Sequence, residues 1–128
     1  MELEQLICFG LSKTFALSSV KKEFQKAVSE PWRTTPPWKR YQEKLLQSLA
    51  VLEDHMEQAI KLAQFEKLSG FDDLYCIRYP NAKKNVRVIY TIYDDSIILL
   101  LAFLEKKDSD YQRAIENAKK RLKLLNSD

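Results

Sequence analysis

Glycine, proline, cysteine and histidine are all scarce in this chain, whose 128 residues include 2 Gly, 4 Pro, 2 Cys and 1 His. So few glycines and prolines disfavour an all-β protein, because tight turns depend on these residue types. Two cysteines and one histidine cannot supply the four ligands of a structural zinc site. Cys8 and Cys76 lie in apolar segments and are expected to be buried thiols, and His55 a surface residue within a helix. A Gly-rich phosphate loop, a nucleophile elbow and metal-ligand spacing are also missing, so we expect no cofactor and no metal.

Long apolar runs are missing too. The run from Ser96 to Leu104 stops at Glu105, well short of the roughly 18 residues that a membrane span requires. The N-terminus lacks a secretory signal pattern, so we expect a cytoplasmic protein without a membrane partner. A composition of 45% hydrophobic and 30% charged residues is typical of a globular protein. The length predicts one domain over residues 1–128, with 1–70 mainly helical and 71–128 forming a sheet and a terminal helix.

The net charge of +3 is unevenly distributed along the chain. Residues 1–73 hold 10 Lys and Arg against 11 Asp and Glu, whereas residues 74–128 hold 11 against 7. The C-terminal part is therefore positive and would attract a polyanion. A solvated basic helix face would explain the same excess, so charge alone leaves both interpretations open.

Two helices are predicted in the N-terminal part. Ser18 or Ser19 can cap the first, whose apolar positions recur at helical spacing until Pro31 ends it. Thr35 is a plausible cap for the second, in which apolar residues three or four apart predict a helix of about 30 residues. Those residues are Trp38, Tyr41, Leu45, Leu49, Leu52, Met56, Ala59 and Ala63. This helix either pairs with the first as an antiparallel hairpin or projects and offers a face to a partner.

The pattern changes to strand-like after Gly70. Segments 74–79, 86–93 and 96–104 are rich in Val, Ile, Tyr and Leu, and Asp94-Asp95 is a two-residue turn signal. A weaker strand is expected over residues 4–10, and a terminal helix begins at a Ser109 to Gln112 capping box. We therefore predict an α+β fold, with an N-terminal helical hairpin packed on a small curled antiparallel sheet and a C-terminal helix.

Cationic side chains gather at the ends of the predicted strands. Side chains alternate faces along a strand, so Arg87 would lie on the open face of the sheet if Val88 faces the helices. Arg78 could share that face. Lys106 and Lys107 follow the central strand, and Tyr111 begins the next helix.

Such a set of groups suits metal-independent RNA cleavage. Arginine binds phosphate through forked donors, and lysine or tyrosine with a lowered pKa can exchange protons with the 2′-hydroxyl and the leaving 5′-oxygen. A purely structural role would also explain each of these residues, least easily Arg87, which is the one charge inside an otherwise apolar strand.

The C-terminal residues resemble the RelE/ParE toxin superfamily of bacterial type II toxin–antitoxin pairs, including its HigB-like and phage Gp49-like branches. The resemblance rests on Leu74-Tyr75-Cys76-Ile77-Arg78, Val86-Arg87-Val88-Ile89-Tyr90, the run from Ile97 to Lys107, and Ala114 to Leu122. It covers about 50 residues in the right order and spacing.

This resemblance implies a ribosome-dependent endoribonuclease that cuts mRNA, arrests translation and is silenced by a cognate antitoxin. Arg78 and Arg87 would hold the scissile phosphate, and Lys106 or Lys107 with Tyr111 would transfer protons. Independently of the resemblance, Lys83 and Lys84 lie in a loop and are expected to contact backbone phosphates, and Arg113 is a further candidate for RNA binding.

Two departures from the family pattern leave open which residue is the general acid and which is the general base. Many relatives carry a histidine where this chain has Leu101, and the segment from Asp108 to Tyr111 differs from the usual one. A gyrase-inhibiting ParE-like toxin and a non-toxic phage-derived binding module remain alternatives. An antitoxin would cover the cationic sheet face or embrace the long helix, and the sequence predicts no oligomeric state.

Overall fold

The computed structural model describes residues 3–6, 9–29, 38–68, 70, 73–79 and 85–127. These residues build one six-stranded sheet with the order β1-β2-β6-β5-β4-β3. The strands are β1 (Leu3–Gln5), β2 (Thr14–Leu17), β3 (Phe65–Lys67), β4 (Tyr75–Arg78), β5 (Val86–Tyr93) and β6 (Ser96–Leu104). The helices are α1 (Val20–Ser29), α2 (Trp38–His55), the 3-10 helix η2 (Met56–Lys61) and α3 (Asp108–Ser127).

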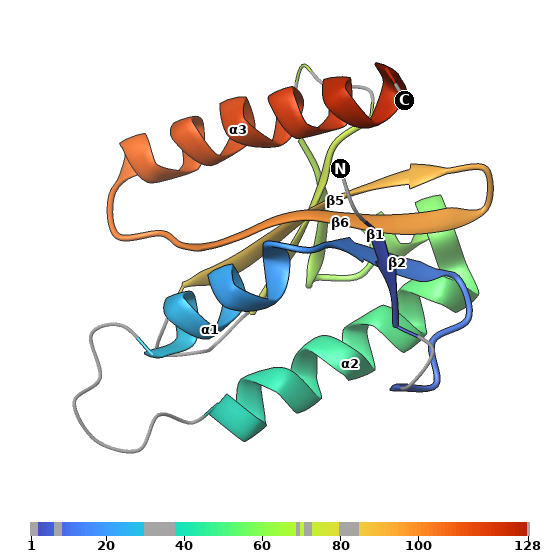
Figure 1. The fold of residues 1–128 in the computed structure, drawn as a ribbon. Helices are drawn as coiled ribbons and strands as arrows, with labels where there is room; N and C mark the ends of the chain where they lie inside the picture. The colour runs from blue at the N-terminus through green and yellow to red at the C-terminus, as the bar shows by residue number, and fades with distance from the viewer. Residues whose placement is uncertain are drawn as a thin grey trace.

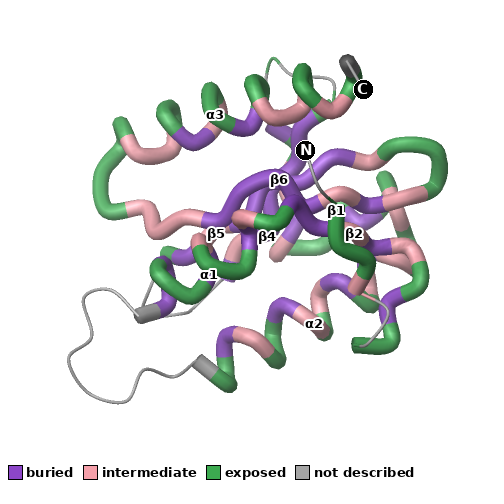
Figure 2. Tube along the Cα trace, viewed as in Figure 1, coloured by how far each residue is buried: buried purple, intermediate pink, exposed green. Residues whose placement is uncertain are grey.

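Helices cover both faces of the sheet. Figure 1 shows α1 and α2 on one face, running in opposite directions, and α3 across the other face. β6 lies between β2 and β5, and its middle residues are buried, as expected for an apolar central strand covered on both sides. Figure 2 shows this buried layer between helices whose outer faces are exposed. The predicted α+β class, helical hairpin and C-terminal helix are confirmed.

The β5–β6 hairpin turns at Asp94 and Asp95, as predicted. Both residues have positive φ, 49° and 63°, which a two-residue type I′ turn requires at its two central positions. Aspartate tolerates this left-handed conformation better than most side chains. The register is thereby fixed from Tyr93 opposite Ser96 down to Val86 opposite Leu104, with one irregularity between Ile89 and Tyr90.

The sheet differs from the prediction in its pairing. β2 runs parallel to β6, with Thr14 opposite Ile97, so the sheet is mixed and not wholly antiparallel. The single weak strand expected over residues 4–10 is instead two short antiparallel strands, β1 and β2. Gly10, at φ +81°, lies in the turn between them, a conformation that glycine adopts without a steric penalty.

The long helix is also shorter than predicted. α2 ends at His55, which is exposed as the last residue of the helix and does not lie in its middle, and a 3-10 turn follows. Met56 has a φ of +50°, outside the right-handed helical region, so the α-helix cannot continue through it. The chain then enters β3, which pairs with the outer edge of β4. The proposed cap at Thr35 lies outside the described residues.

A side-chain pair closes the edge of β6 beyond the end of β2. Glu23 of α1 accepts a hydrogen bond from the Ala102 N–H (3.2 Å), and Arg121 of α3 donates to the Leu100 carbonyl (2.7 Å). The two side chains also pair with each other, at 2.6 Å between Arg121 Nη2 and Glu23 Oε2. Backbone groups that β2 does not reach are thus satisfied by side chains from helices on opposite faces.

Candidate functional site

Two cross-strand rows form the sheet face beneath the start of α3. Arg78 of β4 is opposite Arg87 of β5, which in turn is opposite Phe103 of β6. In the adjacent row, Glu66 of β3 and Ile89 of β5 flank Cys76. Directly opposed residues and residues two apart on a strand share a face, so both arginines lie on one side of the sheet, as predicted.

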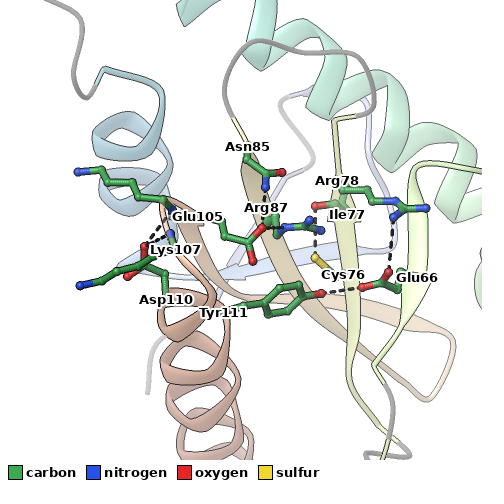
Figure 3. Close-up of polar contacts among 11 residues, drawn as sticks. Glu66, Cys76, Ile77, Arg78, Asn85, Arg87, Glu105, Lys107, Asp110 and Tyr111 are labelled. Carbon is green, nitrogen blue, oxygen red and sulfur yellow. Dashed lines mark hydrogen bonds and ion pairs between the residues drawn. The ribbon is translucent and has the colours of Figure 1, made fainter.

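Arg87 is enclosed and does not lie on an open face. Its side chain is 14% exposed, because Tyr111 of α3 packs over it with 4.8 Å from the guanidinium carbon to the ring centroid. Its Nε donates to Glu105 Oε1 (3.2 Å), which also accepts a hydrogen bond from Asn85 Nδ2 (2.6 Å). Figure 3 shows Glu105 bonded to both Asn85 and Arg87.

One nitrogen of this guanidinium donates no hydrogen bond to the described residues. Arg87 Nη1 is buried and has no hydrogen-bond acceptor among the described residues. Burial works against the charged form, but Cys76, Glu105 and Tyr111 favour it, and the pKa of Arg87 lies above its ordinary value. The site therefore holds a permanent cation with a donor that an incoming anion could satisfy.

Tyr111 is held as a neutral phenol. Burial raises its pKa, and its hydrogen bond to Glu66 acts in the same direction. The hydroxyl donates to Glu66 Oε1 over 2.7 Å, and the ring lies tilted against Phe103 with centroids 5.7 Å apart. The raised pKa makes Tyr111 a weaker acid than an ordinary tyrosine, contrary to the lowered pKa expected of a proton-transfer group.

Arg78 points away from Arg87, toward β3 (Figure 3). Its Nε donates to the Ala63 carbonyl (2.8 Å), and its Nη1 lies 3.6 Å from Glu66 Oε2. The side chain is 41% exposed, so this guanidinium remains accessible to solvent. Glu66 consequently connects Arg78 with Tyr111.

Cys76 is buried, as predicted, and lies between Arg87 and Tyr111 (Figure 3). Burial raises the pKa of its thiol more than the nearby Tyr111 and Arg87 lower it. The thiol donates to the Ile77 carbonyl at 3.6 Å. A protonated buried thiol is a packing group and not a nucleophile. Cys8 lies outside the described residues.

Lys106 and Lys107 directly precede α3. Their backbone N–H groups donate to Asp110 Oδ2, at 2.9 and 3.1 Å, and these bonds lower the pKa of the Asp110 carboxyl. α3 begins at Asp108, so the cap is Asp110 reaching back to the preceding turn and not the predicted Ser109 to Gln112 box. Both lysines are exposed, and Figure 3 shows Lys107 pointing away from Arg87.

The remaining predicted RNA contacts lie at the periphery. Arg113 is exposed on α3, on the turn after Asp110. Lys83 and Lys84 fall outside the described residues. The described residues contain no group of three or more His, Cys, Asp or Glu that could hold a metal ion. None of the described helices is long and apolar enough to cross a membrane.

Comparison with known families decides the family of this chain. The family described as phage-derived protein Gp49-like (DUF891) matches residues 36–123, more than half of the 128. The chain belongs to this family. The resemblance to the RelE/ParE superfamily, in its Gp49-like branch, is thereby confirmed. Among solved structures, a mutant of the E. coli toxin RelE in the free state is similar at 17% identity and a TM-score of 0.48, over 81% of this chain and 94% of that chain. No curated protein matches the chain.

Three polar residues of this Gp49-like site were missed by the sequence analysis: Glu66, Asn85 and Glu105. Glu105 could have been found, because it lies two residues after Phe103 and must share its face if the strand pattern continues. Glu66 could not, since β3 spans only three residues and gives no periodic signal. Its contact with Tyr111 joins residues 45 apart in the chain.

Proposed function

We propose that this Gp49-like protein is the toxin of a type II toxin–antitoxin pair, a metal-independent endoribonuclease that cuts mRNA on the ribosome in the cytosol. A cognate antitoxin would silence it. The observation that carries this proposal is the enclosed Arg87 with its unsatisfied Nη1 donor. A buried donor without an acceptor is unfavourable, and a phosphate oxygen is the strongest acceptor that RNA offers.

Arg87 would stabilise the reacting phosphate. The 2′-oxygen attacks the adjacent phosphorus, negative charge develops on the non-bridging oxygens, and the bond to the 5′-oxygen breaks. Arg87 is held in place by Glu105 and the Tyr111 ring, so its charge is oriented before the substrate arrives. Fixed donors of this kind typically contribute about 100- to 1000-fold in rate.

Proton transfer would use the groups beside this guanidinium. Tyr111 keeps its proton and could give it to the leaving 5′-oxygen only after its hydroxyl turns away from Glu66, to which it donates. Glu66 and Glu105 are the carboxylates able to take the proton of the 2′-hydroxyl. Arg78, Lys106 and Lys107 would contact flanking phosphates, together with Lys83, Lys84 and Arg113.

The test is induced expression in a bacterium, following growth and mapping mRNA 5′ ends. Wild type should arrest growth and produce new cuts in translated messages. Arg87→Ala should abolish both, and Arg87→Lys should lose most of the cutting because an ammonium lacks the guanidinium fork. Arg40→Ala, at an exposed position of α2, is the matched control and should cut like wild type.

The other outcomes separate the alternatives. Arrest without cuts would indicate the gyrase-inhibiting type of toxin. No arrest from a soluble protein with a wild-type circular dichroism spectrum would indicate a decayed toxin or a binding module. Cutting that survives in Arg87→Ala would refute the role of the guanidinium in stabilising the reacting phosphate.

A further inference from the structure

A groove with a cationic lining lies beside Arg78, between α2 and the edge of the sheet. The groove has a volume of about 340 Å³ and is lined by Lys44, Gln47, Ser48 and Val51 of α2, with Gln64, Arg78 and Tyr79 from the sheet side. We name it the α2 groove. Arg78 belongs to both places, since it lines the groove and also pairs with Glu66 of the candidate site.

The lining of the α2 groove has the chemistry of a nucleotide site. Lys44 and Arg78 supply two cations, and none of the described residues that line it is acidic. Gln47 and Gln64 each offer an amide donor and an acceptor, and their side chains make no hydrogen bond within the described residues. Val51 adds an apolar surface against which a base could lie. By contrast, the groove of similar volume beside α3 contains Asp73.

The position of the groove connects it to the phosphate on Arg87. Arg78 and Arg87 are directly opposed on β4 and β5, so their Cα atoms are about 4.5–5.5 Å apart. The two side chains then diverge, Arg87 beneath Tyr111 and Arg78 toward β3 (Figure 3). An RNA strand with one phosphate on Arg87 would have to pass Arg78 and turn round the edge of the sheet for its neighbouring nucleotide to reach α2, which lies on the other face (Figure 1).

We infer that the α2 groove binds the nucleotide next to the scissile phosphate, and that Gln47 and Gln64 read its base. This inference rests on the proposed ribonuclease function and gives it a source of sequence preference. Carboxamides are suited to the task, because each can donate to and accept from the edge of an unstacked base. Lys44 and Arg78 would hold the phosphate of that nucleotide.

The experiment is the same mapping of mRNA 5′ ends, now scored for the base on either side of each cut. Gln47→Ala and Gln64→Ala should retain cutting but weaken the preference at one flanking position by roughly five- to tenfold, the lower part of the range for a good base contact. Gln25→Ala, an exposed glutamine of α1, is the matched control and should leave the preference unchanged. Lys44→Gln should lower the amount of cutting without changing the preference, whereas Lys39→Gln, exposed on α2 outside the groove, should not.

The outcomes distinguish this inference from the function on which it rests. If wild type, Gln47→Ala and Gln64→Ala all make Arg87-dependent cuts with the same base preference, the α2 groove does not read the base. The proposed ribonuclease activity would still stand. Wild-type cuts without any flanking preference would overturn this role of the α2 groove equally. Absence of cuts from wild type would remove both proposals. Because Gln47 and Gln64 come from different elements, a folding defect in one variant leaves the other to decide, with circular dichroism as the check.

Discussion

At the scale of single residues, the site is a set of charges that satisfy one another almost completely. Glu105 accepts from Arg87 and Asn85, and Glu66 accepts from Tyr111 and pairs with Arg78. Two arginines therefore face two carboxylates, and an RNA phosphate must compete with them. The donor left over on Arg87 is where that competition favours the phosphate, because no protein acceptor is displaced there.

The Tyr111 hydroxyl can be removed without removing its ring. Tyr111→Phe keeps the contacts with Arg87 and Phe103 but loses the 2.7 Å hydrogen bond to Glu66. We expect unfolding in urea to show a loss of about 1.5–3 kcal/mol, the usual range for a hydrogen bond to a charged group. Tyr93→Phe, at a side chain that is 67% exposed, should change stability by less than about 0.5 kcal/mol. Equal stability of wild type and Tyr111→Phe would mean that the bond to Glu66 contributes nothing.

At the scale of elements, a long periodic pattern of apolar residues was sufficient to predict a helix or strand. Strands of three or four residues carry too little pattern to be predicted in this way. α1, β5, β6 and α3 were predicted because each carries a long apolar pattern of one period. β1, β2 and β3 have three or four residues, and their existence depends on a partner strand that local sequence cannot specify. The same limit explains the overlong helix, since apolar spacing continues through η2 while Met56 turns the backbone.

The start of α3 depends on one carboxylate. Asp110 accepts from the N–H groups of Lys106 and Lys107, and these bonds lower its pKa. A lowered folded-state pKa gives stability that is present above the unfolded value of about 4 and is lost as the pH falls through the folded value. Asp110→Asn should therefore lower the melting temperature at pH 7, and this difference should shrink toward zero on acidification below pH 4.

Asp108→Asn is the matched control for this prediction, because Asp108 lies in the same turn and accepts no backbone hydrogen bond from any residue that the structure describes. It should have the smaller effect at pH 7. A difference between wild type and Asp110→Asn that is constant from pH 7 down to pH 3 would contradict the role assigned to the ionised carboxylate.

At the scale of the whole molecule, the helices on the two faces are connected through the sheet. Glu23 and Arg121 join α1 and α3 around the free edge of β6, and Tyr111 with Glu66 joins α3 to β3. On the opposite face Tyr79, the residue after β4, stacks on Tyr41 of α2 at 5.3 Å and donates to its carbonyl at 2.9 Å. The sequence predicted the layers but none of these long-range pairs, because each joins polar groups distant in the chain.

Three buried or partly buried tyrosines, Tyr79, Tyr90 and Tyr111, make the fold sensitive to alkali. Burial is the largest cause that raises the pKa of Tyr79, Tyr90 and Tyr111 above the ordinary value. A raised folded-state pKa contributes stability that is complete below the unfolded value of about 10 and is lost as the pH rises above it. Tyr79 directly follows β4, and Tyr90 and Tyr111 belong to β5 and α3, so their ionisation should unfold the whole molecule together. We expect phenolate absorbance and far-ultraviolet circular dichroism to change in one coincident transition above about pH 10. If all 6 tyrosines ionised near pH 10 while the dichroism stayed native, the burial of these hydroxyls would be wrong.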